Sequence, residues 1–231
     1  MRGTGRNGEI RTVLLASPWL LHPDGDDLAV AAVEFTDDFR RSFVPYEMAA
    51  TPEIFEQEEL SPGDEAFFIG RFVFRDGRST NTPTVRFGSI AQIGGDPVLQ
   101  KGRPCGDRDQ ESFLVECHSL SGFSGSPVFA YRGARMKGTE DDPNAVVVVP
   151  QVGMRVYLLG VDWGNDPWRA DVLDKSRDER VTPEEYVKAS SGMALVVPAW
   201  KIRDVLDRDE LRDARAERER KMRTGMVSDT A

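Results

Sequence analysis

Histidine and cysteine are scarce in this sequence: His22 and His118 are the only histidines, and Cys105 and Cys117 are the only cysteines. Two cysteines are too few to build a fold on disulfides, and they leave open one bridge or two free thiols. No group of cysteines and histidines has the spacing of a zinc site, and the acidic residues lack the spacing of an EF-hand. We therefore expect neither a metal nor a cofactor.

Long apolar runs and an excess of basic residues are also missing. The 231 residues contain 30 Lys and Arg against 39 Asp and Glu, a net charge of −9. This balance argues against a nucleic-acid partner, and the lack of a membrane-length apolar run argues against a membrane one. The start of the chain resembles a signal peptide only faintly, because Pro18 interrupts its apolar stretch. A cytoplasmic location is therefore the default expectation, which a signal upstream of the printed sequence would change, and no pattern indicates an oligomeric state.

Short apolar runs separated by glycine and proline dominate the rest of the chain. Several short strands at this spacing predict a closed or packed antiparallel sheet, and hence an all-β barrel or sandwich. Residues 36–62 lose the pattern and predict a connecting segment across the surface. The predicted strands are residues 28–35, 65–73, 84–93, 112–118, 126–131, 145–152, 154–163 and 193–198.

One helix is predicted to begin near Pro198. Ile202, Val205 and Leu206 fall on one of its faces and predict that its first turns pack on the body of the protein. Its strongly charged continuation predicts a solvated helix or a frayed tail, and a partner-binding helix is the alternative. Pairs spaced for i,i+4 contacts along it are Asp204/Arg208, Glu217/Lys221 and Glu219/Arg223.

The segment from Gly122 to Val128, with the sequence GFSGSPV, predicts a tight turn that presents Ser124. Gly122 and Gly125 allow backbone conformations and close approaches that a Cβ atom would block. A serine hydroxyl must be held exposed and relieved of its proton before it acts as a nucleophile. The turn can also direct the N–H groups of residues 122 and 124 at one point, where an oxyanion would form. An ordinary turn between two strands is the alternative interpretation.

Four segments of the chain, in the same order, resemble bacterial trypsin-like serine peptidases of the chymotrypsin superfamily. Residues 116–128 resemble the nucleophile region, and residues 27–30 (DLAV) resemble the strand that carries the catalytic aspartate. Residues 159–164 (LGVDWG) resemble the strand beside the substrate, and residues 192–199 resemble the closing strand before a C-terminal helix. Each motif alone is short, and the resemblance rests on their joint occurrence between residues 25 and 206.

The resemblance implies an all-β, chymotrypsin-like fold of two antiparallel barrels with the site in the cleft between them. It divides the chain into a remnant of the first barrel (1–36), a connection (37–63), the complete second barrel (64–206) and a charged helical tail (207–231). It also implies Ser124 as the nucleophile, the N–H groups of Gly122 and Ser124 as the oxyanion hole, and Asp27 as the residue that orients a histidine. The substrate-binding positions it implies are His118, Asp162, Trp163 and Gly164.

The chain departs from the family at the catalytic histidine. In the family this histidine precedes the aspartate by several tens of residues, whereas His22 lies only five residues before Asp27, in a Pro-Asp-Gly turn. So short a loop is not expected to carry an imidazole between Asp27 and Ser124, so we do not expect His22 to be the base. The chain therefore resembles a family member that begins after its histidine.

Two further positions bear on activation and specificity. Phe123 stands where many animal members have an aspartate that pairs with a new N-terminus, so that mode of activation is not expected. The resemblance places His118 at the base of the primary specificity pocket, where it would favour an acidic or polar side chain; a partly buried polar residue is the alternative. Trp163 and Gly164 would pair with the substrate backbone as an added strand, unless Trp163 is a core aromatic.

Together these patterns predict the lineage of a serine endopeptidase that acts on protein or peptide substrates through an acyl-enzyme. Because a base is missing, we expect this chain to be inactive or to retain residual activity. The alternative is a non-catalytic pseudo-peptidase that binds extended peptides. A third interpretation is a fragment that folds poorly, with apolar faces and strand edges uncovered around residues 12–35.

Overall fold

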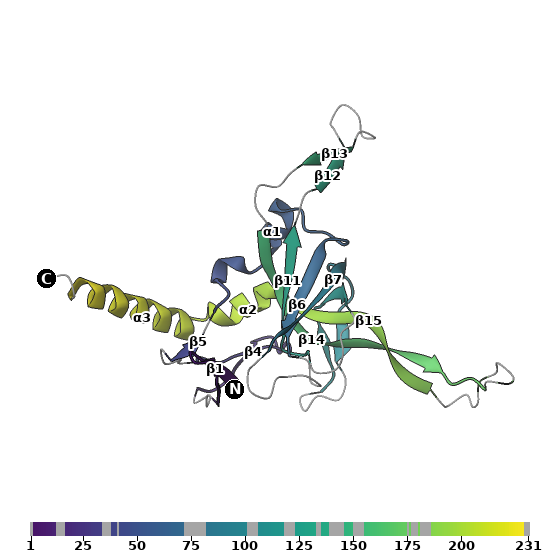
Figure 1. Cartoon of the computed structure of the whole chain (residues 1–231), viewed down its shortest axis with the longest axis horizontal. Coiled ribbons are helices and arrows are strands. Elements are labelled where there is room, and N and C mark those ends of the chain that lie inside the picture. The colour runs from purple at the N-terminus through teal and green to yellow at the C-terminus, as the bar shows by residue number, and fades with distance from the viewer. Residues whose placement is uncertain are drawn as a thin grey trace.

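A closed six-stranded barrel forms the centre of the computed structural model (Figure 1). Its strands follow the order β10-β15-β14-β11-β6-β7, and every neighbouring pair is antiparallel. They are β6 (Glu65–Gly70), β7 (Thr84–Gln92), β10 (Phe113–Glu116), β11 (Pro127–Arg132), β14 (Arg155–Asp171) and β15 (Tyr186–Pro198). The structure describes residues 2–12, 17–33, 38–40, 42–71, 82–100, 106–117, 123–132, 135–138, 146–149, 155–174, 176, 180 and 186–228.

The connectivity of the barrel explains its closure. Strands β6, β7 and β10 pair in succession, and so do β11, β14 and β15. The pairs β6–β11 and β10–β15 then join the two groups, so that no strand of the barrel is left at an edge. The chain is thus a mostly β protein with a closed antiparallel barrel and a C-terminal helix, as the spacing of apolar runs predicted.

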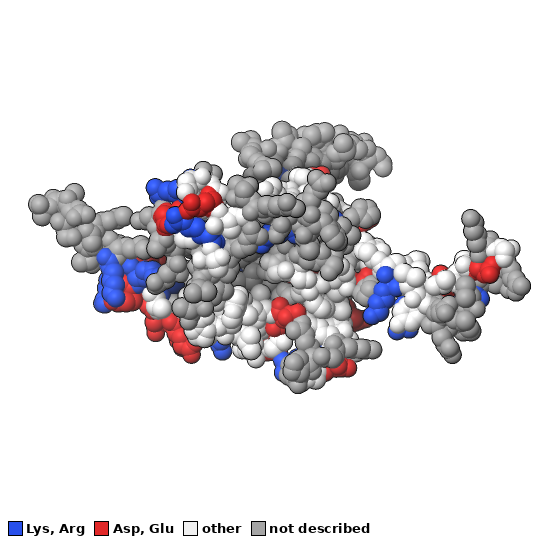
Figure 2. Space-filling model, turned by 60° about the horizontal axis from the view of Figure 1, so that its bottom comes forward, with Lys and Arg blue, Asp and Glu red and all other residues white. Residues whose placement is uncertain are grey.

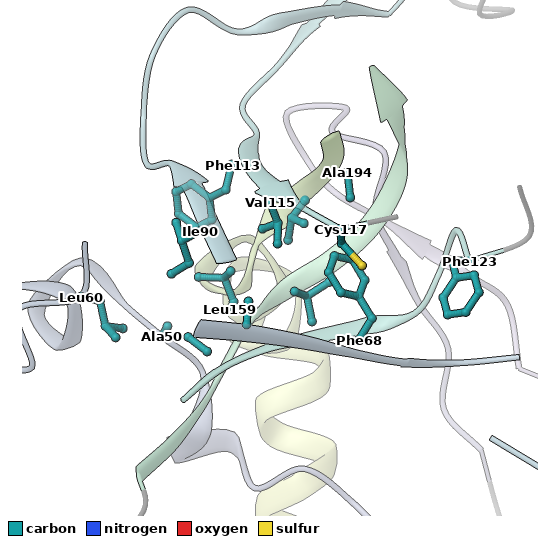
Figure 3. Packing of buried hydrophobic residues seen from close by; sticks show 14 residues of the cluster. Ala50, Leu60, Phe68, Ile90, Phe113, Val115, Cys117, Phe123, Leu159 and Ala194 are labelled. Carbon is teal, nitrogen blue, oxygen red and sulfur yellow. The ribbon is translucent and has the colours of Figure 1, made fainter. Parts of the chain in front are cut away.

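Apolar side chains from alternate strand positions fill the barrel. In β6, Ala66 and Phe68 are buried while Glu65 is exposed, which is the period of two expected for a strand with one face in the core. Two partly buried aromatic residues pack against this core, because Phe55 and Trp200 lie with their ring centroids 5.4 and 5.3 Å from that of Phe113. Figure 3 shows the cluster, which includes Phe68, Ile90, Val115, Cys117, Phe123 and Leu159.

Smaller sheets lie outside the barrel. A three-stranded sheet has the order β2-β1-β5, and three further pairs are β3–β4, β8–β9 and β12–β13. The predicted strand at residues 28–35 is described as far as residue 33, and within that part Ala29 and Val30 form β4. These strands are β1 (Arg2–Gly5), β2 (Ile10–Thr12), β3 (Leu20–Leu21), β4 (Ala29–Val30), β5 (Phe39–Arg40), β8 (Val98–Gln100), β9 (Arg108–Gln110), β12 (Arg135–Gly138) and β13 (Val146–Val149).

The segment predicted to be a plain connection contains short helices. A 3-10 helix, η1, covers Tyr46–Met48, and α1 covers Pro52–Gln57. The hydroxyl oxygen of Thr51 accepts a hydrogen bond from the N–H of Ile54 at 3.4 Å, and Pro52 occupies the first helical position. Both are helix-starting features, so the helix follows from local capping rather than from an apolar stripe.

The predicted C-terminal helix is present but divided. Helix α2 (Ala199–Leu206) begins directly after Pro198, and α3 (Asp209–Ser228) follows a break at residues 207–208. Glu217 and Lys221 form the predicted i,i+4 ion pair at 3.6 Å. In α2, Asp204 faces His22, and at the break the guanidinium of Arg208 donates to the carbonyl of Leu21 at 3.4 Å. None of the described helices is long and apolar enough to cross a membrane.

Two barrel strands extend much further than their apolar patterns indicated. We predicted strands that end at Trp163 and begin at Met193, but β14 continues to Asp171 and β15 starts at Tyr186. Their outer parts pair with each other as a two-stranded ribbon that projects from the barrel (Figure 1). Both faces of this ribbon lie outside the core, so its residues do not show the apolar alternation of a buried strand.

Candidate active site

Ser124 lies exposed in a tight turn immediately before β11. The turn closes with the N–H of Ser126 donating to the carbonyl of Phe123 at 2.9 Å. Gly125 has a φ of +88°, a conformation that glycine adopts without the steric penalty of a Cβ atom. Residues 123–126 therefore form a glycine-dependent turn around Ser124, as the sequence predicted.

Two main-chain hydrogen bonds hold this turn against strand β14. The N–H of Gly125 donates to the carbonyl of Asp162 at 2.7 Å, and the N–H of Asp162 donates to the carbonyl of Ser126 at 2.9 Å. Below the turn, the ring of Phe123 is almost fully buried, and the guanidinium of Arg86 lies 4.7 Å from its centroid. A buried aromatic at this position anchors the turn to the barrel core.

The hydroxyl group of Ser124 points at the next residue of β14. Its Oγ donates to the carbonyl oxygen of Trp163 at 3.3 Å, a long hydrogen bond that a closer partner could displace. The indole of Trp163 is itself held, because its Nε1 donates to Oγ of Ser112 at 2.9 Å. Ser124 and Trp163, which the sequence assigned to catalysis and to substrate binding, therefore lie together.

Asp162 places a carboxyl group beneath the turn. Its residue is only 1% exposed, and Oδ1 accepts a hydrogen bond from the N–H of Gly164 at 3.2 Å. Burial raises the pKa of Asp162 to about 7, although the hydrogen bond from Gly164 opposes the shift. The structure thus brings together Ser124 and three of the predicted binding residues, Asp162, Trp163 and Gly164, around one stretch of β14.

The imidazole of His22 is buried between carboxylates. Its side chain is 0% exposed, with Nδ1 3.1 Å from Oδ2 of Asp26 and Nε2 3.6 Å from Oδ2 of Asp204. These are ion-pair distances, although neither nitrogen has the alignment of a hydrogen bond. Asp204 belongs to α2, so His22 connects the N-terminal segment to this helix.

Lys201, also in α2, completes this charged cluster. Its Nζ lies 3.1 Å from Oδ2 of Asp26 and 3.3 Å from Oε2 of Glu111. Burial alone would lower the pKa of Lys201, but the hydrogen bonds and charges of Asp26 and Glu111 outweigh it and raise the pKa. His22 and Lys201 therefore share one carboxylate oxygen of Asp26, which suits a structural contact.

Asp27 lies beside the same region. Its N–H donates to Oε1 of Gln110 at 2.7 Å, and Gln110 is buried and also accepts from Nε2 of Gln100 at 3.1 Å. Asp27 and His22 both line a cavity of about 420 Å³, together with Gln100 and Arg108. Asp27, which the resemblance implied to orient a histidine, and His22, which was not expected to be the base, thus line the same cavity.

Several sequence assignments lie outside the described residues, namely Gly122 of the oxyanion hole, His118 and Cys105. Cys117 is a free thiol, and burial raises its pKa. The described residues contain no group of three His, Cys, Asp or Glu side chains that could hold a metal ion. Ser112 and Arg86, which support Trp163 and Phe123, were not found from the sequence, because neither lies in a recognisable motif.

No family model, curated protein or solved structure matches this chain. Its class therefore rests on the fold and the site described above: a closed antiparallel barrel that presents an exposed serine on a glycine turn beside β14.

Proposed function

We propose that this chain is a chymotrypsin-like, non-catalytic relative of serine peptidases that binds an extended polypeptide along β14 beside Ser124. The observation that carries the proposal is the exposed Ser124 hydroxyl, directed at the carbonyl of Trp163. In such a protein, residues 1–36 would be the end of a first barrel and residues 64–206 the second. The closed barrel formed between Glu65 and Pro198 supports this division.

Strand β14 offers a free side to a peptide beyond Gly164, since the Trp163 carbonyl and the Gly164 N–H are already bonded to Ser124 and Asp162. Its pairing with β11 ends at Val161 opposite Pro127, and beyond it β15 is its only partner strand among the described residues. A Cβ atom added at Gly164 would have no neighbour within 4 Å, so no atoms of the part of the chain that the structure describes fill the space beside this residue. An extended peptide could add to this edge through main-chain hydrogen bonds.

The position of His22 is why we propose binding without efficient cleavage. A serine needs a base within hydrogen-bond reach to lose its proton during attack. The imidazole of His22 is buried, and its two nitrogens lie against Asp26 and Asp204. With His22 held in this way, Ser124 has no described histidine to act as its base, and only residual acyl transfer is expected from oxyanion stabilisation.

Serine endopeptidase activity through an acyl-enzyme is the second candidate. It is favoured by the exposure of Ser124 and by the hydrogen bonds that fix its turn against Asp162. In that case Gly122 and Ser124 would supply the oxyanion hole, and Asp27 would orient the histidine that acts as base. His118 would then lie at the base of the specificity pocket.

A paired binding and turnover assay tests the proposal. A fluorescent tripeptide library and a biotinylated fluorophosphonate would be presented to the wild-type chain, to Ser124→Ala and to Gly164→Val. We expect peptides to be retained uncut by the first two proteins, and retention to be lost in Gly164→Val, whose side chain obstructs β14. Turnover that disappears in Ser124→Ala would establish the endopeptidase instead, and absence of both binding and turnover would overturn the proposal.

A further inference from the structure

The ribbon formed by the outer parts of β14 and β15 carries a second feature of interest. Its register pairs Trp168 with Ala189 and Ala170 with Val187, so these four side chains share one face. Trp168 is 60% exposed and Val187 is 56% exposed. An apolar strip therefore lies uncovered on a ribbon that projects from the barrel (Figure 1).

The opposite face of the ribbon is cationic at its centre. Arg169 and Lys188 occupy directly paired positions, an arrangement of like charges that destabilises a sheet. The guanidinium of Arg169 lies 4.6 Å from the ring centroid of Tyr186, whereas the nearby Asp171 is paired with Arg180 at 2.5 Å. An acidic group placed against Arg169 and Lys188 would relieve their repulsion. In Figure 2 basic atoms lie next to uncharged ones on the projecting arm.

The unpaired edge of β14 in the ribbon favours a partner in an extended conformation. The free side of β14 is continuous with the stretch at Trp163 and Gly164, and β15 is its one described partner strand as far as Asp171. Pro167 has no N–H to donate, and only alternate residues from Trp168 to Asp171 direct their main-chain groups to this edge, because the others bond to β15. Unpaired main-chain donors and acceptors of this kind match an extended strand.

We infer that the ribbon is a second recognition surface for an extended polypeptide that alternates apolar and acidic residues. The segment adds as a strand to β14, with apolar side chains on the Trp168 face and acidic ones near Arg169 and Lys188. The inference rests on the proposed function, since one continuous peptide would occupy both the Ser124 site and the ribbon. A second copy of the chain fits less well, because it brings the same cations.

Two labelled peptides test this surface. Each is about ten residues long, enough to follow the ribbon at roughly 3.3 Å per residue, and alternates valine with either glutamate or lysine. Binding is measured by fluorescence anisotropy to the wild-type chain, Trp168→Ala and the control Trp19→Ala. Trp19 is 58% exposed and lies outside the ribbon, so it matches Trp168 in exposure. A further variant, Arg169→Glu with Lys188→Glu, inverts the charge.

We expect the wild-type chain to prefer the valine–glutamate peptide. Loss of an aromatic contact in Trp168→Ala should weaken binding about tenfold, while Trp19→Ala changes nothing. The charge-inverted protein should prefer the valine–lysine peptide. Equal binding of both peptides by the wild-type chain, or an unchanged affinity in Trp168→Ala, would overturn the inference. So would a dimer, seen by sedimentation, that Trp168→Ala dissociates.

The two proposals fail in different ways in these assays. In the first case, the wild-type chain binds tripeptides, Gly164→Val does not, and the wild-type chain shows no preference between the two long peptides. The site at Ser124 is then supported and the ribbon surface is not. If tripeptides never bind but the valine–glutamate peptide still requires Trp168, the ribbon binds strands and the proposed site at Ser124 is wrong.

Discussion

Nε2 of His22 lies 3.6 Å from Oδ2 of Asp204, which joins the N-terminal segment of the chain to helix α2. The contact is reinforced from the other side, where Asp26 lies 3.1 Å from both Nδ1 of His22 and Nζ of Lys201. A buried histidine enclosed in this way contributes to the fold, and its nitrogens are not presented to a substrate. This assignment is important because it accounts for one of the two histidines in the chain.

Replacing His22 should therefore damage stability rather than chemistry. In His22→Ala, Asp26 and Asp204 lose a buried partner, and a small void remains in their place. We expect the free energy of unfolding to fall by roughly 2–4 kcal/mol, measured by urea denaturation. Trp19→Ala, at an exposed position, should stay within about 0.5 kcal/mol of the wild-type chain. A variant that keeps its stability but loses Ser124-dependent turnover would show that His22 is a base.

Because of Asp162, the free energy of unfolding should decrease as the pH rises. Its pKa is raised from 3.8 to about 7, so the folded protein holds a proton that the unfolded chain releases at lower pH. The contribution of this group is therefore fully favourable below pH 4 and is lost progressively as the pH rises to about 7. The cause is burial of the carboxyl group without an ion-pair partner strong enough to offset it.

Asp162→Asn isolates this effect, because the amide keeps an acceptor for the N–H of Gly164 but does not ionise. Relative to the wild-type chain, the variant should gain stability steadily between pH 4 and 7 and then hold a constant advantage of roughly 1–4 kcal/mol. Urea denaturation of both proteins at a series of pH values measures the difference, in which the other titrating groups cancel. A difference that does not change with pH would contradict the assignment.

The barrel was predictable because its strands are short apolar runs separated by turn residues. Positions such as Phe68 and Val128 are apolar in short runs bounded by glycine and proline, and both are fully buried in the structure. The turn around Ser124 was also predictable, since GFSGSPV contains the glycine that its positive φ requires. In both cases a local pattern of residues reports directly on the local structure.

Other features depended on contacts that no local pattern contains. The pairing of Trp168 with Ala189 continues the sheet beyond the core, where exposed faces carry no apolar alternation. The contact between His22 and Asp204 joins residues far apart in the chain, and the support of Trp163 by Ser112 is equally non-local. The burial of Asp162 likewise follows from the packing of the turn on β14 and not from its neighbours in sequence.

The conformation of Gly125 should be essential to the turn. A φ of +88° is unfavourable for alanine, so Gly125→Ala is expected to reduce stability by roughly 1–2 kcal/mol. It should also lower fluorophosphonate labelling of Ser124, if labelling occurs, because the hydroxyl would be displaced. Gly164→Ala serves as the control, since its new Cβ atom meets open space and its φ does not lie in the left-handed region. Equal stability of the two variants would count against the turn described here.

Replacing Ser112 should affect peptide binding while the barrel stays folded. Its hydroxyl accepts the indole N–H of Trp163 at 2.9 Å, and Trp163 in turn supplies the carbonyl that Ser124 contacts. Ser112→Ala leaves the indole without this acceptor, at a cost of about 1 kcal/mol. Since Trp163 is then held less firmly, tripeptide binding should weaken several-fold while the barrel stays folded. Ser112→Thr retains a hydroxyl and should restore binding, whereas loss of binding in both variants would point to packing at residue 112 rather than to the hydrogen bond.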